Sequence, residues 1–379
     1  MDQIVNVTAQ PSASSQIAVE RAIAEMRAGR PVLLKGPRGS AVVVCVEALD
    51  AAQKSWLEGL MTGLPGRASF ARLLLQGPRL RHLGSPNGRD GALALPVLDL
   101  ARIEHLSFTL GARLDAPASV LSPLDDAALE LARIALVLPA LVVVPATARR
   151  AGPLVLGVSC DAIFAERAAA VDNLHIVGRA PVPLEGAPQT EFVVFRGGEG
   201  LRDQVAIIVG QPDLAKPVSV RLHSACLTGD LFGSLKCDCG DQLRTTVRHM
   251  AETGGGVLLY LDQEGRGNGL SNKIRAYRLQ AQGYDTYDAD AILGFEHDQR
   301  HFGFAAKMLR QLGVQRVDLL TNNPEKIAAL EAAGLEVASH RRVLGRATDH
   351  NLHYLATKRD RAGHFLDAEL KASPARAKE

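Results

Sequence analysis

The sequence is poor in aromatic residues and in net charge. Aromatic residues make up 4% of its 379 residues, and 43 Lys and Arg stand against 41 Asp and Glu, which leaves a net charge of +2. Such a balance gives no reason to expect a nucleic-acid or membrane partner, because both need a concentrated basic surface. The length and a hydrophobic content of 47% are typical of a soluble α/β protein of about two domains.

The sequence also lacks a long hydrophobic run and an export signal. Its longest apolar run, 134–144, contains Pro139 and is shorter than the ~18 residues that a membrane-spanning helix needs. The opening residues 1–6 lack the basic start and apolar core of a signal peptide. Five cysteines without such a signal favour free thiols in a reducing compartment. We therefore expect a cytoplasmic protein without disulfide bonds.

Three of the five cysteines lie close together, with the spacing C-x10-C-x-C. Cys226, Cys237 and Cys239 have polar neighbours, whereas Cys45 and Cys160 lie in apolar stretches that are typical of buried thiols. Three thiolates bind zinc but leave one tetrahedral position for a water, which zinc ionises near neutral pH. The pattern predicts a catalytic zinc site and a hydrolytic reaction.

Three alternatives compete with a catalytic zinc site. The cysteines could be ordinary buried thiols, but their polar neighbours disfavour this. His223 could complete a closed structural site, but the sequence has no second C-x-C or C-x-x-C pair to form a zinc ribbon. A structural zinc module that binds nucleic acid is disfavoured by the balanced charge.

The hydrophobic pattern predicts a mixed α/β fold. A helix at about 15–28 precedes strands at 32–35 and 41–46. Further strands are expected near 191–196, 205–209, 218–222 and 256–261, with a helix at 241–253 and helix-then-strand units at 302–320 and 324–338. Segment 181–188, with three prolines, has the composition of a connection between domains. We expect an α/β (mixed α+β) fold of two domains, 1–177 and 178–367, each a mixed sheet with packed helices, and a disordered tail at 368–379.

Two segments that follow predicted strands are candidates for nucleotide binding. Glu264, in the glycine-rich loop 263–267, can accept from the adjacent N–H groups of a guanine edge, and Arg266 suits phosphate. Asn323-Pro324 predicts a helix start whose N–H groups, with Lys326, would bind an anion. A plain turn and a capped helix with a solvated lysine explain the two patterns equally well. Spacing alone does not make Tyr277, Asp298 or Arg300 catalytic.

The carboxyl-terminal half resembles GTP cyclohydrolase II, the enzyme that opens GTP at the entrance to riboflavin biosynthesis. The resemblance covers about 180–366 and rests on R-x-H-S-x-C-L-T-G-D, C-D-C-G-x-Q-L, Q-E-G-R-G, N-K-I-R-A-Y, Q-G-Y-D-T, L-G-F, L-T-N-N-P-x-K and G-H-F-L. It implies one zinc ion per chain on the three cysteines, magnesium with the triphosphate, and a homodimer. The implied reaction releases formate and pyrophosphate from GTP and leaves 2,5-diamino-6-(5-phosphoribosylamino)pyrimidin-4(3H)-one.

The same resemblance implies roles for single residues. Asp298 matches the proton acceptor, Arg300 the residue proposed to attack the α-phosphate, and Tyr277 a tyrosine needed for ring opening. The positions that match GTP contacts are Arg221, Leu222, His223, Ser224, Ala225, Gln242, Glu264, Gly265, Arg266, Thr286, Thr321 and Lys326. Asp262, Asn268 and Ser271 depart from the family pattern. Because Asp262 replaces a cation beside a polyanion site, we expect altered affinity before lost activity.

The amino-terminal half resembles, more faintly, the 3,4-dihydroxy-2-butanone 4-phosphate synthase domain that is often fused to this enzyme, mainly over 19–34. In that family a dense acidic, magnesium-binding loop follows. Segment 35–40 contains no carboxylate, and magnesium requires oxygen ligands. We therefore expect a degenerate, non-catalytic domain that braces the dimer or covers the active site. The runner-up for the whole chain is a catalytically retired GTP-binding regulatory protein.

Overall fold

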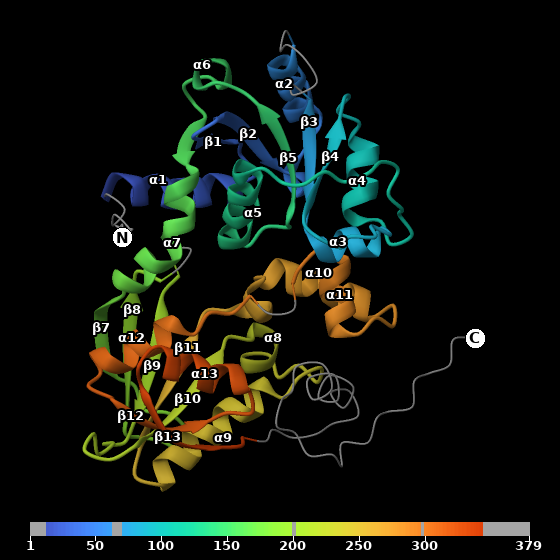
Figure 1. The fold of residues 1–379 in the computed structure, drawn as a ribbon. Coiled ribbons are helices and arrows are strands. Elements are labelled where there is room, and N and C mark those ends of the chain that lie inside the picture. The colour runs from blue at the N-terminus through green and yellow to red at the C-terminus, as the bar shows by residue number, and fades with distance from the viewer. Residues whose placement is uncertain (1–12, 63–69, 199–201, 297–298, 344–379) are drawn as a thin grey trace, which may run out of the picture. The chain divides into compact units, whose positions relative to one another are not determined.

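The computed structural model describes residues 13–62, 70–198, 202–296 and 299–343. The chain divides into a first unit, Met1–Asp172 with Asp290–His297, and a second unit, Asn173–Ala289 with Asp298–Glu379. Each unit is built on one mixed sheet with packed helices, which confirms the expected fold class (Figure 1). The expected tail at 368–379 and the G-H-F-L motif at 363–366 lie outside the described residues.

The first unit contains a six-stranded sheet in the order β4-β3-β5-β2-β1-β6. β1 and β2 form the expected antiparallel hairpin, and β6 pairs with β1 in parallel. The elements are α1 Ala13–Arg27, β1 Val32–Gly36, β2 Gly39–Cys45, α2 Ala51–Met61, β3 Ala71–Leu75, α3 Gly77–His82, β4 Gly91–Leu95, α4 Leu100–Phe108, α5 Pro123–Ala135, β5 Ala140–Pro145, α6 Ala148–Ala151, β6 Leu156–Ser159 and α7 Cys160–Asp172.

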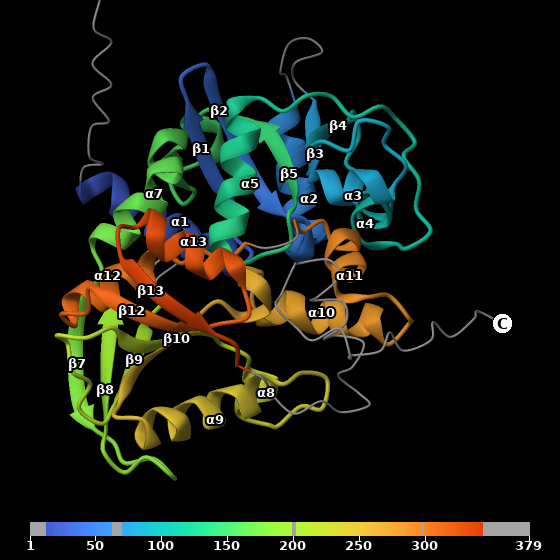
Figure 2. The ribbon, with the colours of Figure 1, turned by 60° about the horizontal axis from the view of Figure 1, so that its bottom comes forward.

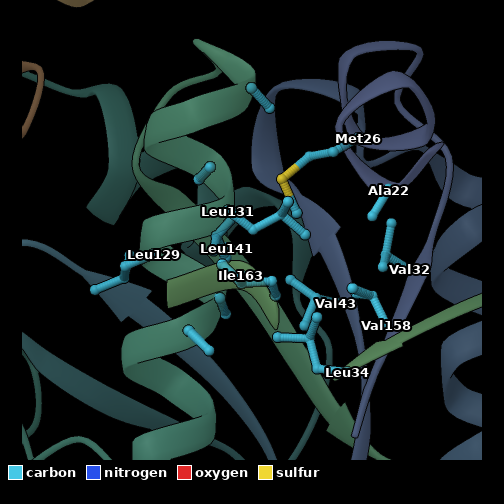
Figure 3. Close-up of a cluster of buried hydrophobic side chains, with 14 of the residues drawn as sticks. Ala22, Met26, Val32, Leu34, Val43, Leu129, Leu131, Leu141, Val158 and Ile163 are labelled. Carbon is cyan, nitrogen blue, oxygen red and sulfur yellow. The ribbon is translucent and has the colours of Figure 1, made fainter. Parts of the chain in front are cut away.

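Both faces of this sheet are buried, because successive strand residues point to opposite faces. Val43 and Leu141 lie on the face that packs against α1, α5 and α7, where Met26, Leu131 and Ile163 meet them (Figure 3). The neighbouring strand residues, such as Val42 and Val142, pack on the other face with side chains of α2, α3 and α4. Leu293 and Phe295, from the segment that returns to this unit, join that second core.

The second unit contains a seven-stranded sheet in the order β13-β12-β10-β11-β9-β8-β7. Strands β10 to β13 pair in parallel, and β7, β8 and β9 continue the sheet in antiparallel fashion. The elements are β7 His175–Pro181, β8 Thr190–Arg196, β9 Gln204–Val209, β10 Val218–Ser224, α8 Leu227–Asp230, α9 Cys239–Glu252, β11 Gly256–Leu261, a 3-10 turn Glu264–Gly267, α10 Leu270–Gln280, α11 Thr286–Ile292, α12 Gly303–Gln311, β12 Arg316–Leu320, α13 Pro324–Ala332 and β13 Glu336–Arg341.

The proline-rich segment 181–188 has a different place from the one its composition suggested. It forms the turn of the β7–β8 hairpin inside the second unit, closed by a bridge between Leu184 and Ala187, and the division between the units falls after Asp172. Prolines end strand pairing as readily at a hairpin turn as in a linker, so composition alone did not separate the two cases.

The parallel part of the second sheet brings three loops to one edge. β10 lies between β11 and β12, and parallel neighbours end at the same edge of a sheet. The loops after β10, β11 and β12 carry Cys226, Glu264 and Asn323 respectively. This edge, at a reversal of strand order, is where open α/β sheets bind ligands. α9 packs beneath β9, β10 and β11, and Figure 2 shows α8 close to its amino-terminal end.

Within the described part of the chain, every helix is too short or too polar to pass through a bilayer.

Candidate metal and nucleotide site

The three clustered cysteines converge on one point at this edge of the second sheet. Cys226 follows β10 and precedes α8, and Cys239 begins α9. The three sulfur atoms lie within 4.8 Å of one another, and the Cys226 and Cys237 sulfurs are 3.6 Å apart. Two thiolates on one tetrahedral zinc, each about 2.3 Å from the ion, would be roughly 3.8 Å apart. The geometry and the donor set therefore fit a metal ion, and zinc among metals.

Electrostatics at the cluster favour thiolate at Cys226. Hydrogen bonds from Cys237 and Cys239, followed by the charge of Lys273, lower the pKa of Cys226. In return, the hydrogen bond with Cys226 raises the pKa of Cys237 to about 11. A metal ligand must be deprotonated, so the first of the three sulfurs is already prepared for binding.

Gly229 of α8 packs directly against the sulfur atoms. A Cβ at this position would lie 2.6 Å from the Cys237 sulfur and 3.0 Å from the Cys226 sulfur. No side chain fits there without displacing a sulfur atom. The glycine of the L-T-G-D motif is therefore explained by close packing against the three cysteines.

His223 is held by Asp230 and Tyr260. Its Nε2 lies 3.1 Å from Oδ1 of Asp230, and its ring stacks on Tyr260, with the ring centroids 5.6 Å apart. Asp230 also accepts from the Tyr260 hydroxyl and from the amide of Cys226. Among the described residues, the group that could hold a metal consists of the three cysteines without a histidine. This geometry disfavours the closed alternative in which His223 is the fourth ligand.

Lys273 connects the thiol cluster to the loop after β11. Its ammonium donates to the Cys226 sulfur at 3.1 Å and to Oε1 of Glu264 at 2.7 Å. Burial would lower the pKa of Lys273, but the hydrogen bonds to Glu264 and Cys226 raise it, so the side chain is charged. Oε2 of Glu264 accepts from the amide of Leu227 at 2.6 Å. Oε1 also accepts from the Gly265 amide at 3.2 Å, so Oε2 is the oxygen that keeps a second acceptor position for a ligand.

Tyr277 lies beside the cysteines. It stands four residues after Lys273 on α10, so both side chains share one helix face. Its hydroxyl is 3.5 Å from Oγ1 of Thr228, and the ammonium of Lys236 lies 4.8 Å from its ring centroid. Burial raises the pKa of Tyr277, so the phenol is protonated at neutral pH.

Two buried cations, Arg221 on β10 and Lys326 on α13, donate to main-chain carbonyls of β12 and β10. Arg221 donates to the Leu320 carbonyl at 3.0 Å and to the Gln242 side chain. Burial lowers its pKa to about 10, with Asp238 and Cys239 opposing the shift, so it stays charged at neutral pH. Lys326 donates to the Leu222 carbonyl at 2.6 Å from the first turn of α13, which Asn323 caps as predicted.

Several buried polar atoms at this edge lack a hydrogen-bond partner within the described residues. They are Nε of Arg221, Oγ of Ser224 and Oε1 of Gln263. Burying such atoms without a partner costs free energy. Their position next to the thiol cluster is typical of a site that receives a polar ligand.

The loop after β11 has an unusual backbone and holds the start of α11. Arg266 has φ of 60°, a left-handed conformation that is uncommon outside glycine, and follows Gly265, also at 60°. Its guanidinium donates to the Thr286 carbonyl at 3.0 Å and lies 4.3 Å from the Tyr287 ring centroid. The main-chain carbonyl of Arg266 accepts from the Gln299 amide at 3.0 Å.

Arg300 and Lys326 both approach Phe302. The guanidinium carbon of Arg300 is 5.6 Å and the Lys326 ammonium 5.3 Å from the centroid of the Phe302 ring. The structure thus brings Arg300 close to a predicted phosphate-binding lysine. Asp298, the predicted proton acceptor, lies outside the described residues.

The structure brings the described site predictions to one region of the second unit, since all lie on or beside the edge formed by β10, β11 and β12. These residues are Arg221, Leu222, His223, Ser224, Ala225, Gln242, Glu264, Gly265, Arg266, Tyr277, Thr286, Arg300, Thr321 and Lys326. Sequence reasoning missed Lys273, Asp230 and Tyr260. Lys273 had a signal, the i,i+4 spacing to Tyr277. Asp230 also had one, as the last residue of the motif R-x-H-S-x-C-L-T-G-D. Tyr260 had none, because a tertiary contact alone brings it to His223.

Three converging cysteines, buried cations and the edge of a parallel sheet together define an α/β protein with a candidate metal site beside a candidate anion site. Residues 175–342 match the family model described as GTP cyclohydrolase II. GTP cyclohydrolase-2 of Xylella fastidiosa (strain Temecula1) is 45% identical over 360 residues, which cover 94% of this chain and 89% of that protein. GTP cyclohydrolase-2 of Azospirillum brasilense is 42% identical, covering 92% and 94%. The chain belongs to the GTP cyclohydrolase II family, which confirms the resemblance seen in the sequence.

Two other similarities are partial or weak. Riboflavin biosynthesis protein RibBA of Bacillus subtilis (strain 168) is 52% identical over 166 residues, 44% of this chain and 42% of that protein. The crystal structure of RibBX, a two domain 3,4-dihydroxy-2-butanone 4-phosphate synthase from A. baumannii, aligns with 86% of this chain and 99% of its own at 15% identity. Its TM-score of 0.30 is too low to show a common fold.

Proposed function

We propose that this enzyme hydrolyses GTP at its imidazole ring and its triphosphate. The products would be formate, pyrophosphate and 2,5-diamino-6-(5-phosphoribosylamino)pyrimidin-4(3H)-one. This reaction would be the first step of riboflavin biosynthesis. The observation that carries the proposal is the meeting of three sulfurs within 4.8 Å with Lys273, which also binds Glu264. The ammonium of Lys273 thus links a proposed metal ligand, Cys226, to the proposed acceptor for the guanine base, Glu264.

Cys226, Cys237 and Cys239 would hold one zinc ion per chain, which supplies Lewis-acid activation of water for attack on C8 of guanine. Glu264 would accept from the base N–H groups at Oε2, where the Leu227 amide leaves an acceptor position open, while Lys273 and the Gly265 amide hold Oε1. The Tyr277 hydroxyl, protonated at neutral pH, is placed to donate a proton as the ring opens.

The triphosphate would lie along the buried cations. Arg221, Arg266 and Lys326 supply fixed donors, Gln242, Ser224, Thr286 and Thr321 add polar contacts, and magnesium would accompany the phosphates. Arg300 would act at the α-phosphate, where the bond to the leaving pyrophosphate breaks. Asp298 would accept the proton from the attacking group.

We further propose that residues 178–367 form the cyclohydrolase domain and residues 1–177 a degenerate, non-catalytic synthase-like domain. The absence of a carboxylate from 35–40, which spans the β1–β2 turn, supports the second assignment. The active form would be a cytoplasmic homodimer.

Formate release tests the proposal. Purified protein loaded with zinc and supplied with magnesium and GTP should release formate and pyrophosphate in equal amounts, and Cys226→Ser should release neither. GTP binding without formate from fully zinc-loaded protein would contradict the proposal and support the alternative, a retired GTP-binding regulator.

A further inference from the structure

Arg79 is the largest fully buried side chain in the described residues, with 1% of its surface exposed. It lies on α3 of the first unit and its hydrogen-bond partners are main-chain carbonyls. Nε donates to Leu106 at 2.8 Å, Nη2 to Thr109 at 2.9 Å, and Nη1 to Ile292 at 3.2 Å. Burial lowers its pKa to about 10, so the group is still charged at neutral pH.

These carbonyls belong to the ends of two helices. Leu106 and Thr109 lie at the carboxyl-terminal end of α4, and Ile292 is the last residue of α11. Helix carboxyl ends carry unpaired carbonyls and partial negative charge. A guanidinium has five donors in a fixed planar arrangement, which suits it to join two such ends.

The carboxyl-terminal end of α11 is closed by two main-chain hydrogen bonds. The Phe295 amide donates to Asp290 and the Gly294 amide to Ala291, with Gly294 at φ of +93°. This is a Schellman motif with glycine at the left-handed position. Phe295 is 6% exposed and lies in the second core of the first unit, and a Cβ on Gly294 would lie 3.5 Å from Cβ of Arg79.

The chain on both sides of this anchored segment is bound to the loop after β11. Before it, the Thr286 carbonyl accepts from Arg266; after it, the Gln299 amide donates to the Arg266 carbonyl, and the Gln263 side chain donates to the His301 carbonyl. Arg266 therefore holds Thr286 and Gln299, on either side of the segment, and Arg79 holds Ile292 between them. The proposed function gives residues 298 and 300 catalytic roles. In the sequence they follow soon after Ile292, the residue that Arg79 holds.

We propose that Arg79 is a positioning residue for the cyclohydrolase reaction, and that the first unit serves the reaction by holding segment 290–296. This inference rests on the proposed function. Among the described residues, the hydrogen bonds of Arg79 go to main-chain carbonyls at the ends of α4 and α11. Its effect therefore passes through the main chain of α11 and the residues that follow it.

The test compares Arg79→Met with a matched control, Arg72→Met. Arg72 also lies in the first unit, and its guanidinium donates to the buried carboxylate of Asp125 at 2.7 Å. Both changes remove a guanidinium from the same unit, but only the first removes a contact to Ile292. Because a misplacement of about 1 Å can cost a reaction about 100-fold, Arg79→Met should lower kcat by roughly 10- to 100-fold. GTP affinity and zinc content should stay close to those of wild type, Arg72→Met should keep kcat within about twofold, and Arg79→Lys should recover part of the loss.

Amide hydrogen exchange gives a second readout that does not depend on turnover. Peptides covering 299–304 should exchange faster in Arg79→Met than in Arg72→Met. If wild-type protein releases no formate, the proposed function fails, and the exchange comparison still tests the anchoring by Arg79. Equal kcat or equal exchange in the two variants overturns the inference. If Arg79→Met does not fold, Phe295→Leu replaces it in the same comparison, with the same outcomes.

Discussion

The ammonium of Lys273 lies 2.7 Å from Oε1 of Glu264, within the same network that reaches the sulfur of Cys226. The residue proposed to hold the guanine base is thereby coupled to a proposed metal ligand by a single buried cation. In an interior of low dielectric, removing one member of such a pair leaves the other without compensation.

Lys273→Met should therefore damage metal and substrate binding together. The loss of a hydrogen bond to a buried charged group costs about 1.5–3 kcal/mol, so kcat/KM for GTP should fall by at least roughly 10-fold, and zinc should be lost more readily to a chelator. Titration with a chromophoric chelator and steady-state kinetics measure the two effects. Lys236→Met is the control, because Lys236 is exposed and its ammonium also lies near the Tyr277 ring, at 4.8 Å from the centroid. Equal effects of the two substitutions would refute the coupling.

Gly229→Ala should empty the metal site. A methyl group 2.6 Å from the Cys237 sulfur must displace it, and a tetrahedral site tolerates little displacement of a ligand. We expect zinc per chain, measured by elemental analysis, to fall well below that of wild type. Gly178→Ala, in the same unit with nothing within 4 Å of the added methyl, should bind zinc normally. Full zinc content in Gly229→Ala would show that the cysteines are not the ligands.

Much of this arrangement could be predicted from the sequence, because it depends on local patterns. The β11 strand was expected at 256–261 and is found as Gly256–Leu261, and Asn323 caps α13 as expected. The motif segments that follow parallel strands meet at one edge of the sheet, because neighbouring parallel strands end at the same edge. The contacts around His223 were not predictable, because the register of β10 and β11 pairs His223 with Tyr260 and no local pattern encodes that register.

The path of segment 290–296 was likewise hidden from the sequence. Leu293, Gly294 and Phe295 read as part of a family motif, but their packing in the first unit depends on Arg79, more than 200 residues earlier. Contacts between residues so far apart in sequence leave no periodicity or spacing to detect.

Acidification should weaken the second unit through His223. Burial lowers the pKa of His223 below its ordinary 6.5, with Asp230 opposing the shift. The unfolded chain therefore binds more protons than the folded one below pH about 6.5, so the stability from neutral His223 is complete above that pH and is lost as the pH falls. Denaturant unfolding at pH 8 and at pH 5.5 should show a larger loss of stability for wild type than for His223→Gln. The same loss in both proteins would exclude His223 as the source.

The coordination of zinc in active protein tests the central claim most directly. X-ray absorption at the zinc edge should show three sulfur atoms at about 2.3 Å and one light atom at about 2.0 Å, and the light atom should respond to GTP. Four permanent protein ligands, a histidine nitrogen from His223 among them, would contradict the account, as would full activity in protein that contains no metal.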